Sequence, residues 1–306
     1  MRRKKIDGPS PKNRLVFGVL VLVLAFFPGF LTAEPVHTEL RIQAPDHVGV
    51  GMPFQVRFFG PKGFQGVSLR WLDKEVGFIA SIESDNGREA VALLGVDLET
   101  PPGTHRITGF VATPDGRQGF AHDVRVQSRE FPEQRLNVSR AMVSPDASLL
   151  PRIESERREA RAALERITPI QYWEEPFIRP VQGSVSSAFG LRRFFNDQPR
   201  APHRGVDLRG PEGTPVRAFS SGEVVLAGDH YFAGGSIYID HGLGVITQYI
   251  HLSEISVQEG DMVVAGQVIG KVGATGRVTG PHLHFGLSIL GMWVDPLPLL
   301  DQGKAS

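Results

Sequence analysis

Glycine and proline interrupt the sequence so often that few segments are long enough for a helix of several turns. The chain of 306 residues holds 35 glycines and 23 prolines, with short runs rich in β-branched residues between them. Short strands separated by turn residues are typical of all-β domains. A chain of this length can form two modest domains with separate cores. The sequence therefore predicts a mainly β protein with two domains.

Residues 35–130 have the pattern of an accessory β domain. Strand-like runs include Phe54–Phe58 and Ile107–Val111, and turn signals such as residues 60–63 and 113–116 separate the strands. Several strands at regular spacing, without a helical period, predict an immunoglobulin-like β-sandwich. Histidines are scattered here and form no catalytic constellation. Such a domain would bind substrate, recruit a partner or cover the active site, and the sequence does not separate these roles.

Residues 131–180 form a connector with one amphipathic helix. Ser148 is in position to cap the start of this helix, and Pro169 is expected to end it. A helix of this kind either packs between the domains or binds a membrane surface, and we favour packing. The apolar residues that recur on one face at helical spacing are Leu149, Leu150, Ile153, Ala160, Ala163, Leu164 and Ile167.

The N-terminus, residues 1–34, has the layout of an export signal. Basic residues precede the apolar run Leu15–Leu31, and Ala33 offers a small residue before a cleavage point. The run is longer than a typical signal core and shorter than a typical membrane span, so it predicts either a cleaved signal peptide or an uncleaved membrane tether. In both cases the positive charge stays in the cytoplasm. Residues from 35 onward are then exported to the periplasm or cell envelope.

Charge and cysteine content exclude several classes of function. Lys and Arg number 33, and so do Asp and Glu, so no net charge draws the protein to nucleic acid. The chain has no cysteine, which excludes disulfides, thiolate metal sites and cysteine nucleophiles. A metal ion in this chain must therefore be held by His, Asp or Glu.

Three short segments in the C-terminal third place histidines in strand-like settings. His203 and Asp207 are four residues apart in an extended segment, which puts both side chains on one face. His282 and His284 alternate on a strand pattern and therefore point the same way. His251 stands in a third apolar segment. Each segment alone is weak support for a site, but the combination is more specific.

Together these side chains match the ligand set of a catalytic zinc ion. His203, Asp207 and one member of the pair His282/His284 would supply three protein ligands and leave the fourth position to water. The two remaining histidines would transfer protons and stabilise the oxyanion. The sequence has no His-Glu-x-x-His segment, so a glutamate base of that kind is not available.

The segment from about Val181 to Pro296 resembles the M23 (lysostaphin/LytM-type) zinc metallopeptidases of the bacterial cell envelope. The resemblance implies an all-β peptidase domain of the duplicated-hybrid-motif type at residues 181–300. It also implies one Zn²⁺ held by His203, Asp207 and His284, with His251 and His282 as the catalytic pair. The matching runs are Ser187–Gly190, Arg192–Arg193, Pro202–Asp207, Gly213–Val216, Tyr249–Leu252 and Thr279–Phe285.

The same resemblance implies an endopeptidase that hydrolyses peptide cross-links between peptidoglycan stem peptides. Zinc-activated water would attack the bond with the help of two histidines, and either His251 or His282 would be the general base. The sequence indicates neither the bond that is cut nor the oligomeric state.

Two other functions fit parts of the pattern. A non-catalytic relative could activate another cell-wall hydrolase, but such relatives lack metal residues that are all present here. Residues 257–270 resemble the hairpins of biotinyl and lipoyl carriers, yet they lack a lysine at the hairpin tip, and Lys271 follows in a strand-like run. The peptidase is therefore the favoured prediction.

Overall fold

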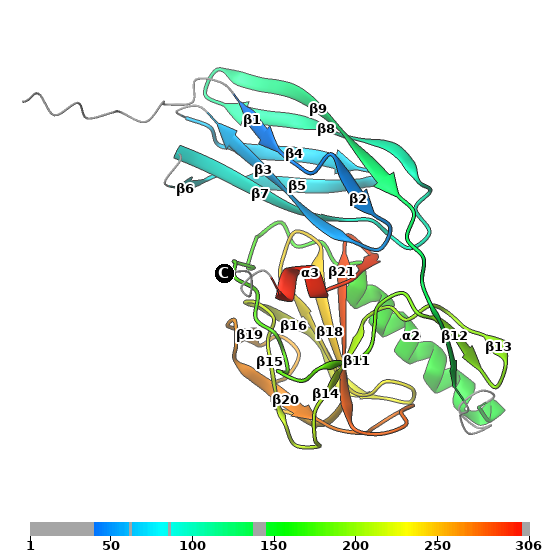
Figure 1. The fold of residues 1–306 in the computed structure, drawn as a ribbon. Coiled ribbons are helices and arrows are strands. Elements are labelled where there is room, and N and C mark those ends of the chain that lie inside the picture. The colour runs from blue at the N-terminus through cyan, green and yellow to red at the C-terminus, as the bar shows by residue number, and fades with distance from the viewer. Residues whose placement is uncertain (1–39, 61–62, 85–86, 137–144, 302–306) are drawn as a thin grey trace, which may run out of the picture. The chain divides into compact units, whose positions relative to one another are not determined.

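The computed structural model describes residues 40–60, 63–84, 87–136 and 145–301 of the chain. Within these ranges the protein is mainly β, as the alternation of short strand-like runs and turn residues predicts (Figure 1). The expected export segment, residues 1–34, lies outside the described residues. In the ranges given above, no helix combines the length and the apolar character needed to cross a membrane.

The N-terminal part of the described chain consists of two β-sheets. The predicted strands Phe54–Phe58 and Ile107–Val111 lie within β3 and β8. One sheet has the order β1-β3-β7-β6, formed by β1 (Arg41–Gln43), β3 (Pro53–Gly60), β7 (Gly87–Gly95) and β6 (Ile82–Ser84). The other has the order β2-β9-β8-β4-β5, formed by β2 (His47–Gly49), β9 (Gly116–Gln127), β8 (Gly103–Thr113), β4 (Gly66–Trp71) and β5 (Lys74–Ala80).

Side chains from both sheets form a shared apolar core. Phe54, Val56 and Phe58 alternate along β3 and are all buried, as expected of a strand with one face toward a core. The ring of Phe54 contacts Trp71 of β4 edge to face, with 5.3 Å between ring centroids. Phe58 meets Phe120 of β9 in the same way at 5.1 Å. These aromatic contacts join the sheets face to face.

The connector adds a strand to the C-terminal part of the molecule. This strand, β10 (Glu133–Leu136), pairs in parallel with β12 (Arg192–Phe195), and Gln134 lies opposite Arg193 in the register. On its other side β12 pairs with β13 (Gln198–Pro199). The pairing brings a residue of the connector next to the segment that precedes His203.

The connector helix α2 (Leu150–Leu164) packs against the C-terminal domain. Its residue Ala163 is buried in a cluster with Leu226, Tyr238 and Ile246, and Ile153 is also buried. The apolar face is narrower than the sequence predicts, because Leu150 and Ile167 are about half exposed, at 51% and 50%.

Both predicted ends of this helix are wrong. At the start, the cap is the carboxylate of Asp146 and not Ser148. This carboxylate accepts a hydrogen bond from the backbone N–H of Ser148 at 2.8 Å. It caps the 3-10 turn η1 (Ala147–Leu149), which continues directly into α2. The helix ends at Leu164, before Pro169, because the chain turns toward the buried carboxylate of Asp240. Arg166 Nε lies 3.3 Å from Asp240 Oδ2, and the hydroxyl of Thr168 donates to the same oxygen at 2.5 Å.

The C-terminal domain is built on a large sheet, with strands of different lengths, that carries the candidate site. Its strand order is β11-β14-β21-β18-β17-β16-β19, and β15, β20 and β22 attach to this path. The short helix α3 (Leu297–Leu300) follows the last strand. The strands are β11 (Val185–Ser187), β14 (Val206–Arg209), β15 (Pro215–Arg217), β16 (Gly222–His230), β17 (Gly234–Asp240), β18 (Val245–Ile255), β19 (Met262–Val263), β20 (Val268–Val272), β21 (His282–Ile289) and β22 (Met292–Val294).

Buried aromatic residues hold the centre of this sheet. Phe285 of β21 is fully buried and lies 5.2 Å from the ring of Tyr249 on β18 and 5.8 Å from that of Phe219. The hydroxyl of Tyr249 accepts the backbone N–H of Phe219 at 2.8 Å, which satisfies both buried polar groups. Strands β18 and β21 are thus fixed against each other next to the histidines that they carry.

Candidate metal centre

Strand pairing brings the five predicted site residues together from separate parts of the sequence. Asp207 on β14 lies directly opposite His284 on β21 in the antiparallel register, and His203 stands just before β14. His282 is the first residue of β21. His251 belongs to β18, the neighbour of β21 on its other side.

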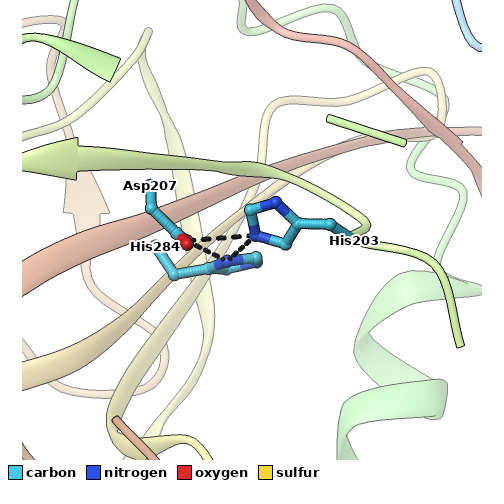
Figure 2. A group of neighbouring side chains, drawn as sticks. All are labelled: His203, Asp207 and His284. Atoms are coloured by element: carbon cyan, nitrogen blue, oxygen red, sulfur yellow. Dashed lines mark hydrogen bonds and ion pairs between the residues drawn. The ribbon is translucent and has the colours of Figure 1, made fainter. Parts of the chain in front are cut away.

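Three of these side chains meet at a single point (Figure 2). The Nε2 atom of His203 lies 2.9 Å from Nδ1 of His284 and 3.0 Å from Oδ1 of Asp207. The Nδ1 atom of His284 lies 2.9 Å from the same oxygen. All three residues are buried, so two imidazole nitrogens and one carboxylate oxygen form a compact, largely solvent-excluded triangle.

The hydrogen bond of His203 with the backbone indicates what the triangle can bind. Its Nδ1 lies 2.8 Å from the carbonyl oxygen of Ala188. A carbonyl only accepts, so Nδ1 carries the proton and Nε2 presents a lone pair toward Asp207 and His284. Lone pairs from two imidazoles and a carboxylate converge where a divalent cation such as Zn²⁺ takes three protein ligands. The residues present therefore fit a zinc ion.

Asp207 remains ionised in this setting. Burial alone would raise the pKa of its carboxyl group, but the close interactions with the side chains of His203 and His284 outweigh burial and hold the pKa well below its ordinary value. Arg193 adds a further positive partner, with one guanidinium nitrogen 3.1 Å from Asp207 Oδ2. The carboxylate thus directs Oδ1 to the histidines and Oδ2 to the arginine.

A chain of hydrogen bonds behind Arg193 reaches back to the connector. Arg193 Nε donates to Gln134 Oε1 at 2.9 Å, and Gln134 Nε2 donates to the hydroxyl of Ser187 at 2.9 Å. Partners behind a metal ligand fix its orientation and tune its affinity for the metal. In this protein strand β10 supplies one of these partners, so the connector contributes to the centre.

His251 and His282 form a second pair beside the triangle. Their ring centroids are 5.0 Å apart, the ring of His251 lies 6.2 Å from that of His284, and His282 Nε2 lies 3.8 Å from Asp207 Oδ1. The backbone carbonyl of Thr275 accepts from His251 Nδ1 at 3.0 Å. The carbonyl of Gly280 accepts from His282 Nδ1 at 2.8 Å. Each neutral ring therefore has an unprotonated Nε2.

Burial keeps His251 neutral in the folded protein. It lowers the pKa of His251 to about 3, and the nearby charges of His284 and His282 act in the same direction. Burial also lowers the pKa of His284, to about 4. Neutral imidazoles of this kind present a lone pair that can ligate a metal ion or accept a hydrogen bond.

The backbone at His251 adopts a conformation that a non-glycine residue seldom takes. Its φ is +68°, in the left-handed region. The backbone N–H of His251 donates to the carbonyl of Ala233 at 2.8 Å, and the β17–β18 register shifts between Tyr249 and Leu252, the stretch that contains His251. Such a conformation costs about 1–3 kcal/mol and persists where the surrounding structure imposes it, often at functional sites. It turns His251 out of the regular alternation of β18.

Comparison with known proteins places this chain in a family. The sequence profile of Peptidase family M23 matches residues 201–296. A crystal structure of an M23 peptidase from Pseudomonas aeruginosa superposes with a TM-score of 0.59 at 32% sequence identity, over 77% of this chain and 87% of that one. The chain belongs to peptidase family M23. The five site residues expected from the sequence all lie within the matched segment of this M23 protein.

Curated M23 relatives match over a shorter stretch. Peptidoglycan DD-endopeptidase ShyA of Vibrio cholerae is 46% identical over 114 residues, which cover 37% of this chain and 26% of ShyA. Lysostaphin of Staphylococcus staphylolyticus is 45% identical over 112 residues, which cover 34% of this chain and 23% of lysostaphin. This chain thus matches about a quarter of the length of its curated relatives.

Sequence reasoning missed the supporting residues of the centre. Arg193 and Ser187 lie within matching runs of the M23 pattern but were assigned no role. Gln134 lies in the connector and has no partner nearby in the sequence, so only the pairing of β10 with β12 reveals its position. No sequence signal marks such a residue, since a glutamine on a short polar strand is ordinary.

Proposed function

We propose that this M23 protein is a zinc-dependent endopeptidase that hydrolyses peptide cross-links of peptidoglycan. The observation that carries the proposal is the buried triangle of His203, Asp207 and His284 with His251 and His282 beside it. The relatives named above support the substrate, because ShyA is a peptidoglycan DD-endopeptidase. By analogy, the scissile bonds are those formed by D-amino acids in the cross-links.

In this proposal His203, Asp207 and His284 hold the zinc ion. When bound, zinc polarises a peptide carbonyl and lowers the pKa of water toward about 7. Asp207 stays ionised and balances part of the charge, while Arg193 holds its second oxygen. The buried setting strengthens these electrostatic interactions because water is largely excluded.

The Nε2 atoms of His251 and His282 would move protons during hydrolysis. One imidazole accepts a proton from the attacking water, and the pair stabilises the oxyanion and returns a proton to the leaving amine. Both rings are oriented for this, because backbone carbonyls accept from their Nδ1 atoms. Proton transfer is assigned to His251 and His282 together. Kinetic measurements on variants of each residue would identify which one is the general base.

We further propose an exported protein with an accessory domain. Residues 1–34 would direct the chain out of the cytoplasm, as a cleaved signal or as a tether. The two N-terminal sheets would form an immunoglobulin-like sandwich, and residues 181–300 a peptidase domain of the duplicated-hybrid-motif type. Periplasmic location agrees with a substrate that lies in the cell wall.

Digestion of purified cross-linked peptidoglycan, analysed by mass spectrometry, tests the proposed activity. We expect cleaved cross-links with the protein alone, none with a chelator, and recovery when zinc is added back. Cleavage that continues after the metal has been removed would refute the zinc mechanism. Bound zinc without any cleavage would favour the alternative in which the protein activates another wall hydrolase.

The carrier alternative has less support. A carrier presents its lysine at an exposed hairpin tip, whereas Lys271 lies within β20. Its Nζ atom forms an ion pair with Glu254 at 2.6 Å. A lysine held along a strand in this way is not presented for attachment of a prosthetic group.

A further inference from the structure

A cavity of about 750 Å³ opens beside the metal centre. His203 and His284 form part of its wall, so whatever occupies it lies next to the triangle. Helix α2 contributes Leu150, Ile153 and Arg157 to the same lining. A volume of this size accommodates a ligand of several peptide units.

The wall of this cavity is strongly basic. Its lining includes Arg157, Arg193, Arg200, Arg204 and Arg277, against a single carboxylate, that of Glu154, among the lining residues. Three of the arginines, Arg193, Arg200 and Arg277, are partly buried. Partly desolvated guanidinium groups attract anions more strongly than exposed ones, because water screens them less.

The arginines lie close enough to influence one another. Burial lowers the pKa of Arg277, and the positive charges of Arg193, Arg200 and Arg157 lower it further. The guanidinium of Arg277 lies over the rings of Phe232 and Phe195, at 4.6 and 5.1 Å from their centroids. The aromatic rings thus hold a cation at the edge of the cavity.

Two of these arginines, Arg157 and Arg200, are only partly matched by protein partners. Arg193 is committed to Asp207. Arg157 and Glu154 are 3.8 Å apart with both side chains more than half exposed, so their ion pair is weak. Arg200 donates to Gln198 Oε1 at 2.8 Å, but its Nε is buried with no hydrogen-bond partner in the described structure. A buried donor of this kind is costly unless a ligand satisfies it.

We infer that this cavity binds a carboxylate of the substrate, so that Arg157 and Arg200 make the enzyme selective for acidic peptides. The planar guanidinium fork matches a carboxylate in two parallel hydrogen bonds. The apolar side chains of Leu150, Ile153 and Phe195 in the same wall suit the aliphatic parts of a peptide. The inference rests on the proposed function, since it names a subsite for the same substrate.

A matched pair of synthetic peptides tests the subsite. One cross-linked peptide carries free carboxylates, and the other is identical except that they are carboxamides. Binding is measured by calorimetry with the zinc-loaded His282→Ala variant, in which turnover is expected to be lost. We expect the acidic peptide to bind on the order of tenfold more tightly, as for loss of one charged hydrogen-bonded contact.

Substitution of the cavity arginines should reduce this preference. In the Arg157→Gln/Arg200→Gln double variant we expect the ratio of the two dissociation constants to approach one. Arg158→Gln is the matched control, because Arg158 is exposed on α2 and does not line the cavity. Equal affinity of the unsubstituted cavity for both peptides, or a preference that survives the double substitution, would overturn the subsite.

The two proposals fail in different ways. If the native enzyme hydrolyses both peptides with equal KM, the proposed peptidase activity is supported and the proposed carboxylate subsite is overturned. If binding depends on the carboxylates but neither peptide is hydrolysed, the proposed subsite is supported and the proposed activity is overturned. In the expected case the acidic peptide has the lower KM with a similar kcat, and the double variant raises that KM.

Discussion

At the scale of single residues, the centre depends on which nitrogen of each imidazole carries a proton. Carbonyl groups of Ala188, Thr275 and Gly280 accept from the Nδ1 atoms of His203, His251 and His282. Each of these rings therefore offers Nε2 to the site. His284 is turned the other way and directs Nδ1 to the triangle. Backbone carbonyls thus determine the tautomers before any metal or substrate is bound.

Arg193→Gln should weaken zinc binding about tenfold or more, because partners of a ligating carboxylate contribute that much to metal affinity. The measurement is a competition titration with a chromophoric chelator, which needs no substrate. Arg192→Gln is the matched control, since Arg192 is exposed and pairs with Glu133 at 3.4 Å. Unchanged zinc affinity in Arg193→Gln would contradict a positioning role for the arginine.

At the scale of elements, the site depends on the close approach of β14 and β21. Gly205 precedes β14, and a Cβ atom there would lie 2.5 Å from the carbonyl oxygen of Phe285 and 2.7 Å from His284 Nε2. These distances are shorter than van der Waals contact, so only glycine lets the strand pass the imidazole. The pairing of Asp207 with His284 follows from this packing.

Gly205→Ala should therefore destabilise the protein by about 1–3 kcal/mol, the usual cost of an overpacked site, and displace the ring of His284. Thermal unfolding in the presence of zinc measures the effect. Gly228→Ala on β16 serves as the control, because a Cβ atom there meets nothing within 4 Å. Equal melting temperatures for the two variants would argue against tight packing at Gly205.

The sequence predicts much of this arrangement and misses what depends on distant pairing. The strand patterns around Phe54 and Ile107 and the alternation of His282 and His284 are local, and they correspond to strands of the structure. The ends of α2 depend on buried Asp240, which attracts residues 166–168 out of the helix. The role of Gln134 depends on a parallel strand pair that joins segments far apart in the sequence.

At the scale of the whole molecule, a buried polar chain links the connector to the core of the C-terminal domain. His241 is fully buried; its Nδ1 donates to the carbonyl of Ser221 at 2.8 Å and its Nε2 accepts from Thr247 at 2.7 Å. The backbone carbonyl of His241 accepts from Tyr172 and Trp173 of the connector. Burial lowers the pKa of His241 to about 4. This chain of hydrogen bonds therefore requires the imidazole of His241 to be neutral, because its Nε2 atom must accept from Thr247.

This requirement predicts a pH dependence of stability. In the unfolded chain a histidine binds a proton below pH of about 6.5, whereas His241 in the folded protein stays neutral down to about pH 4. The unfolded state binds more protons in this window, so stability is full above pH 6.5 and falls as the pH is lowered toward 4. At pH 5 this residue lowers the free energy of unfolding by about 2 kcal/mol.

Urea unfolding of His241→Gln, compared with the unsubstituted protein, checks this value. Glutamine keeps a donor and an acceptor but does not titrate. The free energy of unfolding of the variant should therefore fall by about 2 kcal/mol less between pH 7 and pH 5 than that of the unsubstituted protein. The comparison cancels contributions from other histidines. If both proteins lose the same free energy over this range, His241 does not control the acid sensitivity.

The central claim is that His203, Asp207 and His284 bind the metal while His251 and His282 act on the substrate. The most direct measurement is the zinc content, by mass spectrometry, of purified His284→Ala and His251→Ala with turnover recorded on the same samples. We expect His284→Ala to lose both zinc and activity, and His251→Ala to retain about one zinc per chain with no measurable turnover. Full zinc occupancy in His284→Ala, or near-normal turnover in His251→Ala, would contradict the account.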